Sequence, residues 1–327
     1  RLMTPDYITA NIDWTMNEVL SHIRLVGKNS ETIDVIYIVN DKGELVDDIR
    51  IREVILANPE KKLGEVIDNR FIALNVKDDQ ETASETFKMN NRVALPVVDD
   101  FNILLGIVTI DDILWVTSEE FSEDMQKMGG TEALDEPYLE MPIFRLFKKR
   151  ITWLVVLFLG EMLTATAMGY FQDELARAVV LALFIPLIIS SGGNSGSQAS
   201  TLIIQAMAVG EISLSDWWRV LRREIISGLL LGGVLGVIGF VRILVWSQIF
   251  PKDYGPHFFL LGTAVAFSLV GVVLWGTLSG SMLPILLKRL GADPAVSSAP
   301  FVATLVDVTG LIIYFSVAFI FLKGTIL

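Results

Sequence analysis

The chain has 327 residues, of which 52% are hydrophobic, and its mean hydropathy of +0.53 exceeds that of an ordinary soluble domain. This composition predicts insertion into a membrane. The sequence has no cysteine, which excludes disulfides, thiolate metal sites and a cysteine nucleophile. Only His22 and His257 could serve as imidazole ligands.

Charge is divided unevenly along the chain. Residues 1–150 hold 29 acidic and 17 basic side chains, whereas residues 151–327 hold nine of each. The net charge of −12 therefore belongs to the first part, which should attract cations and bind no nucleic acid. Ordinary solubilising charge is an alternative interpretation. Because residue 1 is Arg, we expect the chain to be a fragment of a longer protein.

Residues 1–117 contain an internal repeat. Tyr7–Ile12 resembles Phe71–Val76 at an offset of 64, and Ile38–Asp41 resembles Val97–Asp100 at an offset of 59. The change of offset predicts about five extra residues in the first copy, around residues 28–33. We expect two similar βαββα-like units.

The second copy contains Leu95–Asp99 followed by Gly106–Asp112. With these motifs and its spacing, the repeat resembles a tandem pair of CBS domains, which would be residues 1–60 and 61–117. The resemblance implies an α/β module.

The same resemblance implies an adenine nucleotide such as ATP as a ligand, held at Thr109 and Asp112. The first copy has Arg50 and Glu53 at the matching positions, which argues against a nucleotide site there. A structural alternative is that Thr109 caps a helix that begins near Asp111.

An acidic connector occupies residues 118–147, and its first part is predicted to be helical. Beyond it, five stretches are long enough to cross about 30 Å of hydrocarbon as helices. They are Ile151–Phe171, Val179–Met207, Ile225–Ile249, Phe258–Leu287 and Ser298–Leu322. The sequence therefore predicts a multidomain protein, in which the α/β CBS module precedes an all-α membrane domain of five transmembrane helices at residues 148–327.

Basic residues cluster at alternate ends of these spans, at 148–150, 219–223 and 288–289. The positive-inside rule then predicts a multi-pass protein of the cell inner (plasma) membrane with a cytoplasmic CBS module and the C-terminus outside.

Two acidic residues lie within the predicted spans. Ionisable side chains in a bilayer are costly and usually line a pathway, so Glu161 and Asp307 are candidate functional residues. At helical spacing Ala303, Asp307 and Gly310 share one face, which leaves room for another helix or an ion. Glu161 has an alternative interpretation as a buried, hydrogen-bonded acid.

The second span combines helix-weakening and polar residues between Ile185 and Ser200. Two interpretations compete: a wet cavity, because polar backbone at this depth needs water or protein, and close helix packing through small residues. Packing accounts for the glycines but not for the amides, so we favour the cavity. Its expected lining residues are Pro186, Gly192, Gly193, Asn194, Gly196 and Gln198.

A cavity of amide, hydroxyl and carbonyl oxygens with one carboxylate suits a hard divalent cation. Mg²⁺ keeps several of its waters and takes only one or two carboxylates. The residues alone predict a divalent-cation pathway.

Two motifs make the resemblance specific: Pro186–Gln198, with its Ser-Gly-Gly-Asn-Ser-Gly core, and Asp293–Gly310, which contains Ala-Thr-Leu-Val-Asp-Val-Thr-Gly. With the CBS pair, the connector and the five spans, they resemble the MgtE family of magnesium channels. Members usually carry a further acidic N-terminal domain. The resemblance implies a homodimer in the lipid bilayer with a pore between the second and fifth spans of the two copies.

The resemblance also implies site residues. Asp307 and the backbone carbonyl of Ala303 would hold hydrated Mg²⁺, and residues that line the same path would be Pro186, Gly192, Gly193, Asn194, Gln198 and Gly310. Cytoplasmic Mg²⁺ would close the channel by bridging acidic side chains of the CBS module and the connector, which would act as a plug. The positions carried over are Asp99, Asp111, Glu132, Asp135 and Glu140.

Other functions fit less well. A sodium- or proton-coupled transporter of divalent cations, with Asp307 and Glu161 as coupled sites, is the main alternative, although five spans show no evident inverted repeat. Neither a catalytic triad nor a phosphate-binding glycine loop is apparent, so we do not expect an enzyme. Asp307 would repel chloride.

Overall fold

The computed structural model describes residues 2–68, 70–173 and 179–325. The chain divides into two compact units, residues 1–122 (unit 1) and 123–327 (unit 2). Unit 1 contains strands and helices, and unit 2 is helical. The two units match the predicted fold class, an α/β CBS pair followed by a helical membrane domain.

Unit 1 contains the predicted repeat. Its first copy comprises β1 (Thr9–Asn11), α1 (Met16–Val26), β2 (Val35–Val39), β3 (Leu45–Arg50), α2 (Ile51–Leu56) and the short helix η1 (Leu63–Glu65). Its second copy comprises β4 (Leu74–Asn75), α3 (Gln80–Asn90), β5 (Ala94–Val98), β6 (Leu104–Thr109) and α4 (Ile110–Met128). α4 continues beyond unit 1, so the first part of the connector is helical, as predicted.

The two copies share one sheet topology. Each sheet has three strands, with a parallel pair followed by an antiparallel pair, in the orders β1-β2-β3 and β4-β5-β6. Both antiparallel pairs have an irregularity at the same position, between Ile38 and Val39 in one copy and between Val97 and Val98 in the other. The loop before β2 covers residues 27–34 and the matching loop before β5 covers 91–93, which confirms five extra residues in the first copy.

Apolar side chains of unit 1 form one core in each copy and a third core shared by both. The shared core contains Tyr37, Val35 and Leu45 from the first copy and Val98, Leu104 and Ile107 from the second. Tyr37 is fully buried, and burial raises the pKa of its phenol well above the ordinary value. The two copies therefore pack as one body through this face.

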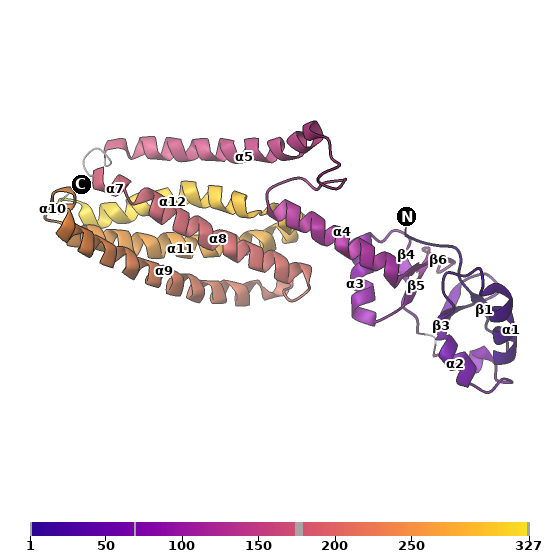
Figure 1. The fold of residues 1–327 in the computed structure, drawn as a ribbon. Coiled ribbons are helices and arrows are strands. Elements are labelled where there is room, and N and C mark those ends of the chain that lie inside the picture. The colour runs from indigo at the N-terminus through magenta and orange to yellow at the C-terminus, as the bar shows by residue number, and fades with distance from the viewer. Residues whose placement is uncertain (1, 69, 174–178, 326–327) are drawn as a thin grey trace. The chain divides into compact units, whose positions relative to one another are not determined.

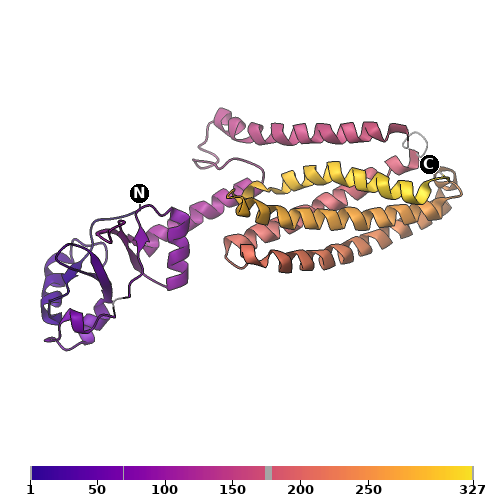
Figure 2. The ribbon, with the colours of Figure 1, turned by 180° about the vertical axis from the view of Figure 1, so that it is seen from behind.

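Unit 2 consists mainly of long helices that run side by side (Figures 1 and 2). They are α5 (Ile143–Tyr170), α7 (Val179–Ala182), α8 (Ile185–Ala208), η2 (Leu214–Asp216), α9 (Trp217–Ile249), α10 (Pro251–Tyr254), α11 (Phe258–Arg289), η3 (Pro294–Val296) and α12 (Ala299–Leu322). Within the described ranges, five helices are long and apolar enough to cross a membrane, which agrees with the five predicted spans.

Two of these spans begin before the predicted residue. α5 starts at Ile143 rather than at Ile151, and the third span starts at Leu214 rather than at Ile225. Hydropathy marks where lipid begins, whereas backbone hydrogen bonds let a helix continue into the headgroup region. The basic residues at 148–150 and 219–223 thus lie on helical extensions of the spans.

Candidate functional site

The glycine-rich segment of the second span is helical throughout. α8 runs without interruption from Ile185 to Ala208, so helical hydrogen bonds occupy the backbone of this segment. Pro186 lies in the first turn of α8, where its missing N–H removes no helical hydrogen bond. The break in the span lies just before it, between α7 and α8.

The glycines of α8 allow close packing. A Cβ atom added to Gly192 would lie 2.5 Å from Val272 Cγ1 of α11, and one added to Gly196 would lie 2.8 Å from Val302 Cγ1 of α12. Gly310 of α12 meets Ile189 and Val272 in the same way. For these glycines the packing interpretation is therefore correct, as small residues let membrane helices approach one another.

The polar residues of α8 form a separate feature, a stripe along a face that the rest of unit 2 leaves exposed. Its members recur every three or four residues, as one helix face requires, and they are Ser190, Asn194, Gln198, Thr201 and Gln205. Amides exposed to hydrocarbon would lack hydrogen-bond partners, so this polar stripe needs water or protein against it. A pocket of about 400 Å³ borders it at Gln198 and Thr201.

Helices α8 and α12 pack antiparallel next to this stripe. The Ser200 hydroxyl donates to the Ser297 carbonyl at 2.7 Å, and the Ser197 hydroxyl donates to the Ala299 carbonyl at 3.0 Å. One helical turn further, Gly193 lies against Ala303. The ladder of contacts fixes the register of the two helices, and Asp307 lies one turn beyond Ala303 on α12.

Asp307 is partly buried, and the carboxyl group of Glu161 from α5 lies close enough to interact with it electrostatically. The sequence singled out both acids but not their contact, because 146 positions separate them and only the packing of α5 on α12 brings them together. Two ionised carboxylates at this range repel, so a positive charge between them, whether a proton or a cation, stabilises the pair.

The predicted regulatory residues of the connector are dispersed along it. Asp135 forms an ion pair with Lys149 at 3.0 Å, and its neighbour Glu136 pairs with Arg145 at 2.6 Å. Glu132 and Glu140 are exposed and form no ion pair among the residues described. The basic start of α5 thus neutralises part of the acidic connector.

The predicted regulatory residues of unit 1 take part in local hydrogen bonds. Asp99 accepts bonds from the backbone N–H groups of Phe101 and Ile103 and so shapes the turn between β5 and β6. A hydrogen bond from Thr109 lowers the pKa of Asp111. Throughout the described parts of the chain, no three His, Asp or Glu side chains form a potential metal cluster. A Mg²⁺ sensor at these residues stays a prediction.

At the expected nucleotide positions, the Thr109 hydroxyl donates to the Asp112 carboxylate at 3.3 Å, at the junction of β6 and α4. Thr109 is buried, with 4% of its surface exposed. This contact joins two side chains and is not a helix cap, in which Thr109 would accept from a backbone N–H. Nucleotide binding at these two residues stays a prediction.

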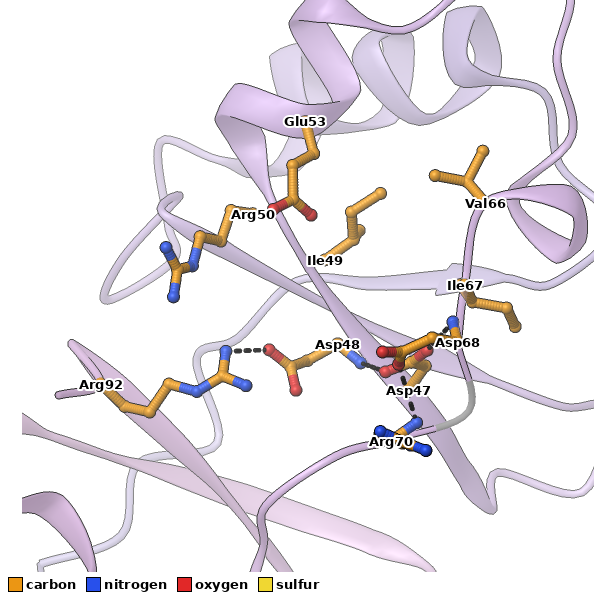
Figure 3. A pocket seen from close by; sticks show the side chains of 10 residues that line it. All are labelled: Asp47, Asp48, Ile49, Arg50, Glu53, Val66, Ile67, Asp68, Arg70 and Arg92. Carbon is orange, nitrogen blue, oxygen red and sulfur yellow. Dashed lines mark hydrogen bonds and ion pairs between the residues drawn. The ribbon is translucent and has the colours of Figure 1, made fainter. Parts of the chain in front are cut away.

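A polar pocket of about 340 Å³ lies elsewhere in unit 1, and residues of both copies line it (Figure 3). Arg92 of the second copy donates to Asp48 of β3 at 2.7 Å, while Asp47 accepts from the backbone N–H groups of Asp48 and Asp68. Burial raises the pKa of Asp48, although the Arg92 charge acts in the opposite direction. Arg50 and Glu53, which occupy the positions that match Thr109 and Asp112, also line the pocket.

Comparison with protein families identifies both units. Residues 1–60 and 63–119 match the CBS domain, and residues 185–317 match the MgtE family, described as a divalent cation transporter. The magnesium transporter MgtE of Thermus thermophilus is 39% identical over 323 residues, which cover 99% of this chain and 70% of that protein. The chain belongs to the MgtE family of magnesium transporters.

Another member of the MgtE family, from Enterococcus faecalis, is 30% identical over 98% of this chain and 68% of its own length. Among solved structures, the cytosolic domain of the Mg²⁺ channel MgtE in complex with ATP matches 35% of this chain and 46% of that chain. The match has 36% sequence identity and a TM-score of 0.35.

Proposed function

We propose that two copies of the chain form a pathway for hydrated Mg²⁺ across the membrane, lined by α8 and α12 of each copy. Membership of the MgtE family supports Mg²⁺ as the transported ion. The main support for the pathway is the exposed polar stripe of α8. It lies next to α12, which bears the partly buried carboxyl group of Asp307. An apolar bilayer would not tolerate this combination unless water or a second chain covers it.

Asp307 and Ala303 supply oxygens suited to a cation that retains its water shell. Mg²⁺ gives up water reluctantly and usually binds through one or two carboxylates, so a single Asp from each copy can hold the ion through its waters. A carbonyl oxygen has two lone pairs, so the Ala303 carbonyl can accept from an ion-bound water in addition to its helical bond. Passage requires such weak, water-mediated contacts, because a fully dehydrated ion would bind too tightly to leave.

A second copy would cover the polar stripe symmetrically. In a two-fold dimer the same surface of each chain meets its counterpart, so two polar stripes would enclose one wet path along the axis. In this arrangement the closely packed glycines hold α8 against α11 and α12, and the polar face of α8 remains available to the ion.

The acidic connector and CBS module would regulate this path. Crowded carboxylates repel one another, and divalent cations relieve the repulsion, so Mg²⁺ would favour a compact, closed state. Two connector acids, Asp135 and Glu136, already have partners on α5. Glu132 and Glu140 are therefore the more available connector ligands.

The test is Mg²⁺ uptake into liposomes that contain the purified chain. Asp307→Ala should reduce uptake by at least tenfold, because the hydrated ion loses its charged partner. Glu211→Ala is the matched control: this acid is exposed in the loop after α8 and should be neutral. Undiminished uptake by Asp307→Ala would remove Asp307 from the pathway.

The same vesicles distinguish a channel from a coupled transporter. Uptake driven by the Mg²⁺ gradient should persist when Na⁺ and H⁺ are equal on both sides. If uptake stops without a Na⁺ or H⁺ gradient, the coupled transporter of divalent cations replaces the channel.

A further inference from the structure

Glu161 belongs to a well-defined contact between α5 and α12. Trp153 Nε1 of α5 donates to the Oγ atom of Ser298, the residue before α12, at 3.2 Å. Further along both helices, the ring of Phe171, just after α5, stacks on that of Phe315 in α12 with centroids 4.5 Å apart. The order of these contacts shows that the two helices run parallel.

Between these two contacts the helices approach each other closely. A Cβ atom added to Gly160 would lie 2.6 Å from Thr304 Cγ2 of α12. Thr304 and Asp307 are three residues apart and so lie on neighbouring positions of one helix face, as do Glu161 and Thr164 on α5. Because Gly160 has no side chain, α5 approaches α12 closely enough for the Glu161 and Asp307 carboxyl groups to interact.

A hydroxyl group about one turn of α5 beyond Glu161 lacks a partner. Thr164 Oγ1 is inaccessible to solvent and makes no hydrogen bond in the part of the chain that the structure describes. Buried polar atoms are nearly always paired, and a bound water is the usual partner when no protein atom serves. One turn of α5 thus offers a carboxyl group that interacts with Asp307 and an unsatisfied hydroxyl.

We propose that Glu161 is a second carboxylate of the intramembrane cation site, and that with Asp307 it holds the water shell of Mg²⁺ within one copy of the chain. The inference rests on the proposed function, because it assumes that Asp307 meets the ion. Glu161 makes the site doubly negative in each copy, and it thereby favours a divalent cation over a monovalent one. Thr164 would accept or donate a hydrogen bond to a water of the same shell.

The experiment measures initial Mg²⁺ uptake against Mg²⁺ concentration for the full chain in liposomes, together with Na⁺ uptake in parallel vesicles. Glu161→Gln should raise the half-saturating Mg²⁺ concentration about tenfold, the effect of losing a charged hydrogen-bond partner, and should lower the ratio of Mg²⁺ to Na⁺ uptake. Glu161→Asp keeps the charge and should restore most of both values.

Trp153→Phe provides the matched structural control, since it removes the Ser298 hydrogen bond from the same helix interface without touching the acids. It should leave the half-saturating Mg²⁺ concentration unchanged. The inference is overturned if Glu161→Gln shifts neither value, or if Trp153→Phe produces the same shift.

Asp307→Asn in the same assay distinguishes a failure of the proposed pathway from a failure of the role assigned to Glu161. Normal uptake by Asp307→Asn contradicts the proposed pathway itself. Impaired uptake by Asp307→Asn together with normal behaviour of Glu161→Gln contradicts only the role of Glu161.

Discussion

Lys127 is a cation in an otherwise acidic segment, and it ties two parts of unit 2 together. Its ammonium group lies 2.6 Å from Glu123 Oε1 on α4 and 2.6 Å from Asp293 Oδ2, at the start of η3. Asp293 also accepts a bond from the Ala295 backbone at 2.8 Å. Lys127 therefore anchors the end of α4 to the segment that leads into α12.

The protonation of Lys127 keeps this anchor intact at neutral pH. Burial alone would lower its pKa, but the hydrogen bonds to Asp293 and Glu123 and their charges outweigh burial and raise the pKa well above the ordinary lysine value. For a base with a raised pKa, the stabilisation is fully present below the unfolded-state pKa and is lost only as the pH rises through the folded-state value. The contact should therefore not respond to pH between 5 and 9, roughly the range below the ordinary lysine pKa.

Replacing Lys127 tests the anchor. Lys127→Met should increase amide hydrogen exchange over residues 123–128 about threefold to fivefold, because a partly exposed ion pair contributes at most about 1 kcal/mol and its loss leaves two carboxylates facing each other. Lys127→Arg keeps the charge and should exchange like the parent chain. Equal exchange in all three proteins would show that the pair contributes nothing to the position of α4.

At the scale of helices, glycine stripes decide how the membrane unit packs. Gly228, Gly232 and Gly236 of α9 face α11, and at Gly232 an added Cβ atom would lie 2.8 Å from Val270 Cα. On the other side of α11, Gly276 and Gly280 meet the backbone carbonyls of Gly192 and Gly196, within van der Waals contact. In lipid the hydrophobic effect does not drive helices together, so van der Waals contact between their backbones stabilises the bundle instead.

A methyl group at one of these contacts should be poorly tolerated. Gly276→Ala places its Cβ against the carbonyl of Gly192, and neither backbone can move without shifting a helix, so we expect a destabilisation of about 1–3 kcal/mol. Gly233→Ala is the matched control in α9, because no atom lies within 4 Å of its added Cβ. Thermal unfolding in detergent should show a lower midpoint for Gly276→Ala only, and equal midpoints would contradict the packing argument.

The same elements show which features a sequence can predict. The repeat and the five spans follow from local periodicity and hydropathy, although two spans begin well before the predicted residue, at 143 against 151 and at 214 against 225. The register of α8 on α12 is a property of packing, so the sequence could not separate the buried Gly192 from the exposed Asn194 beforehand. The spacing of Ser190, Thr201 and Gln205 places them on one helix face with the two predicted amides. This spacing could have predicted the polar stripe, but the apolar character of the whole span obscured it.

Contacts distant in sequence were beyond prediction altogether. Arg92 meets Asp48 only because the two repeat copies pack face to face, and Glu161 meets Asp307 only because Gly160 lets α5 approach α12. In both cases the residues are ordinary in their own segments. Their partnership depends on tertiary structure, which a single sequence does not display.

For the whole molecule, the division of charge between the two parts suggests how ion concentration could control transport. The net charge of −12 lies in residues 1–150, where repulsion among carboxylates opposes compact states. A cation that binds only the compact state stabilises it in proportion to the logarithm of its concentration. Mg²⁺ is the transported ion in this proposal, so its cytoplasmic level would act on the same protein that admits it.

Neutralising the predicted regulatory acids tests this feedback. In a variant that combines Asp111→Asn, Glu132→Gln, Asp135→Asn and Glu140→Gln, protection of the chain from protease should require about tenfold more Mg²⁺ than in the parent. That factor equals about 1.4 kcal/mol of lost preference for the compact state. The physical reason is that fewer carboxylates remain for the ion to bridge.

The control for that experiment must carry the same change of net charge. Glu31→Gln, Glu60→Gln, Glu65→Gln and Glu81→Gln together remove four exposed carboxylates elsewhere in unit 1. If specific sites govern closure, this second variant should need the same Mg²⁺ concentration as the parent. Identical titrations of the two quadruple variants would mean that net charge alone sets the response, because overall self-repulsion depends mainly on the number of carboxylates.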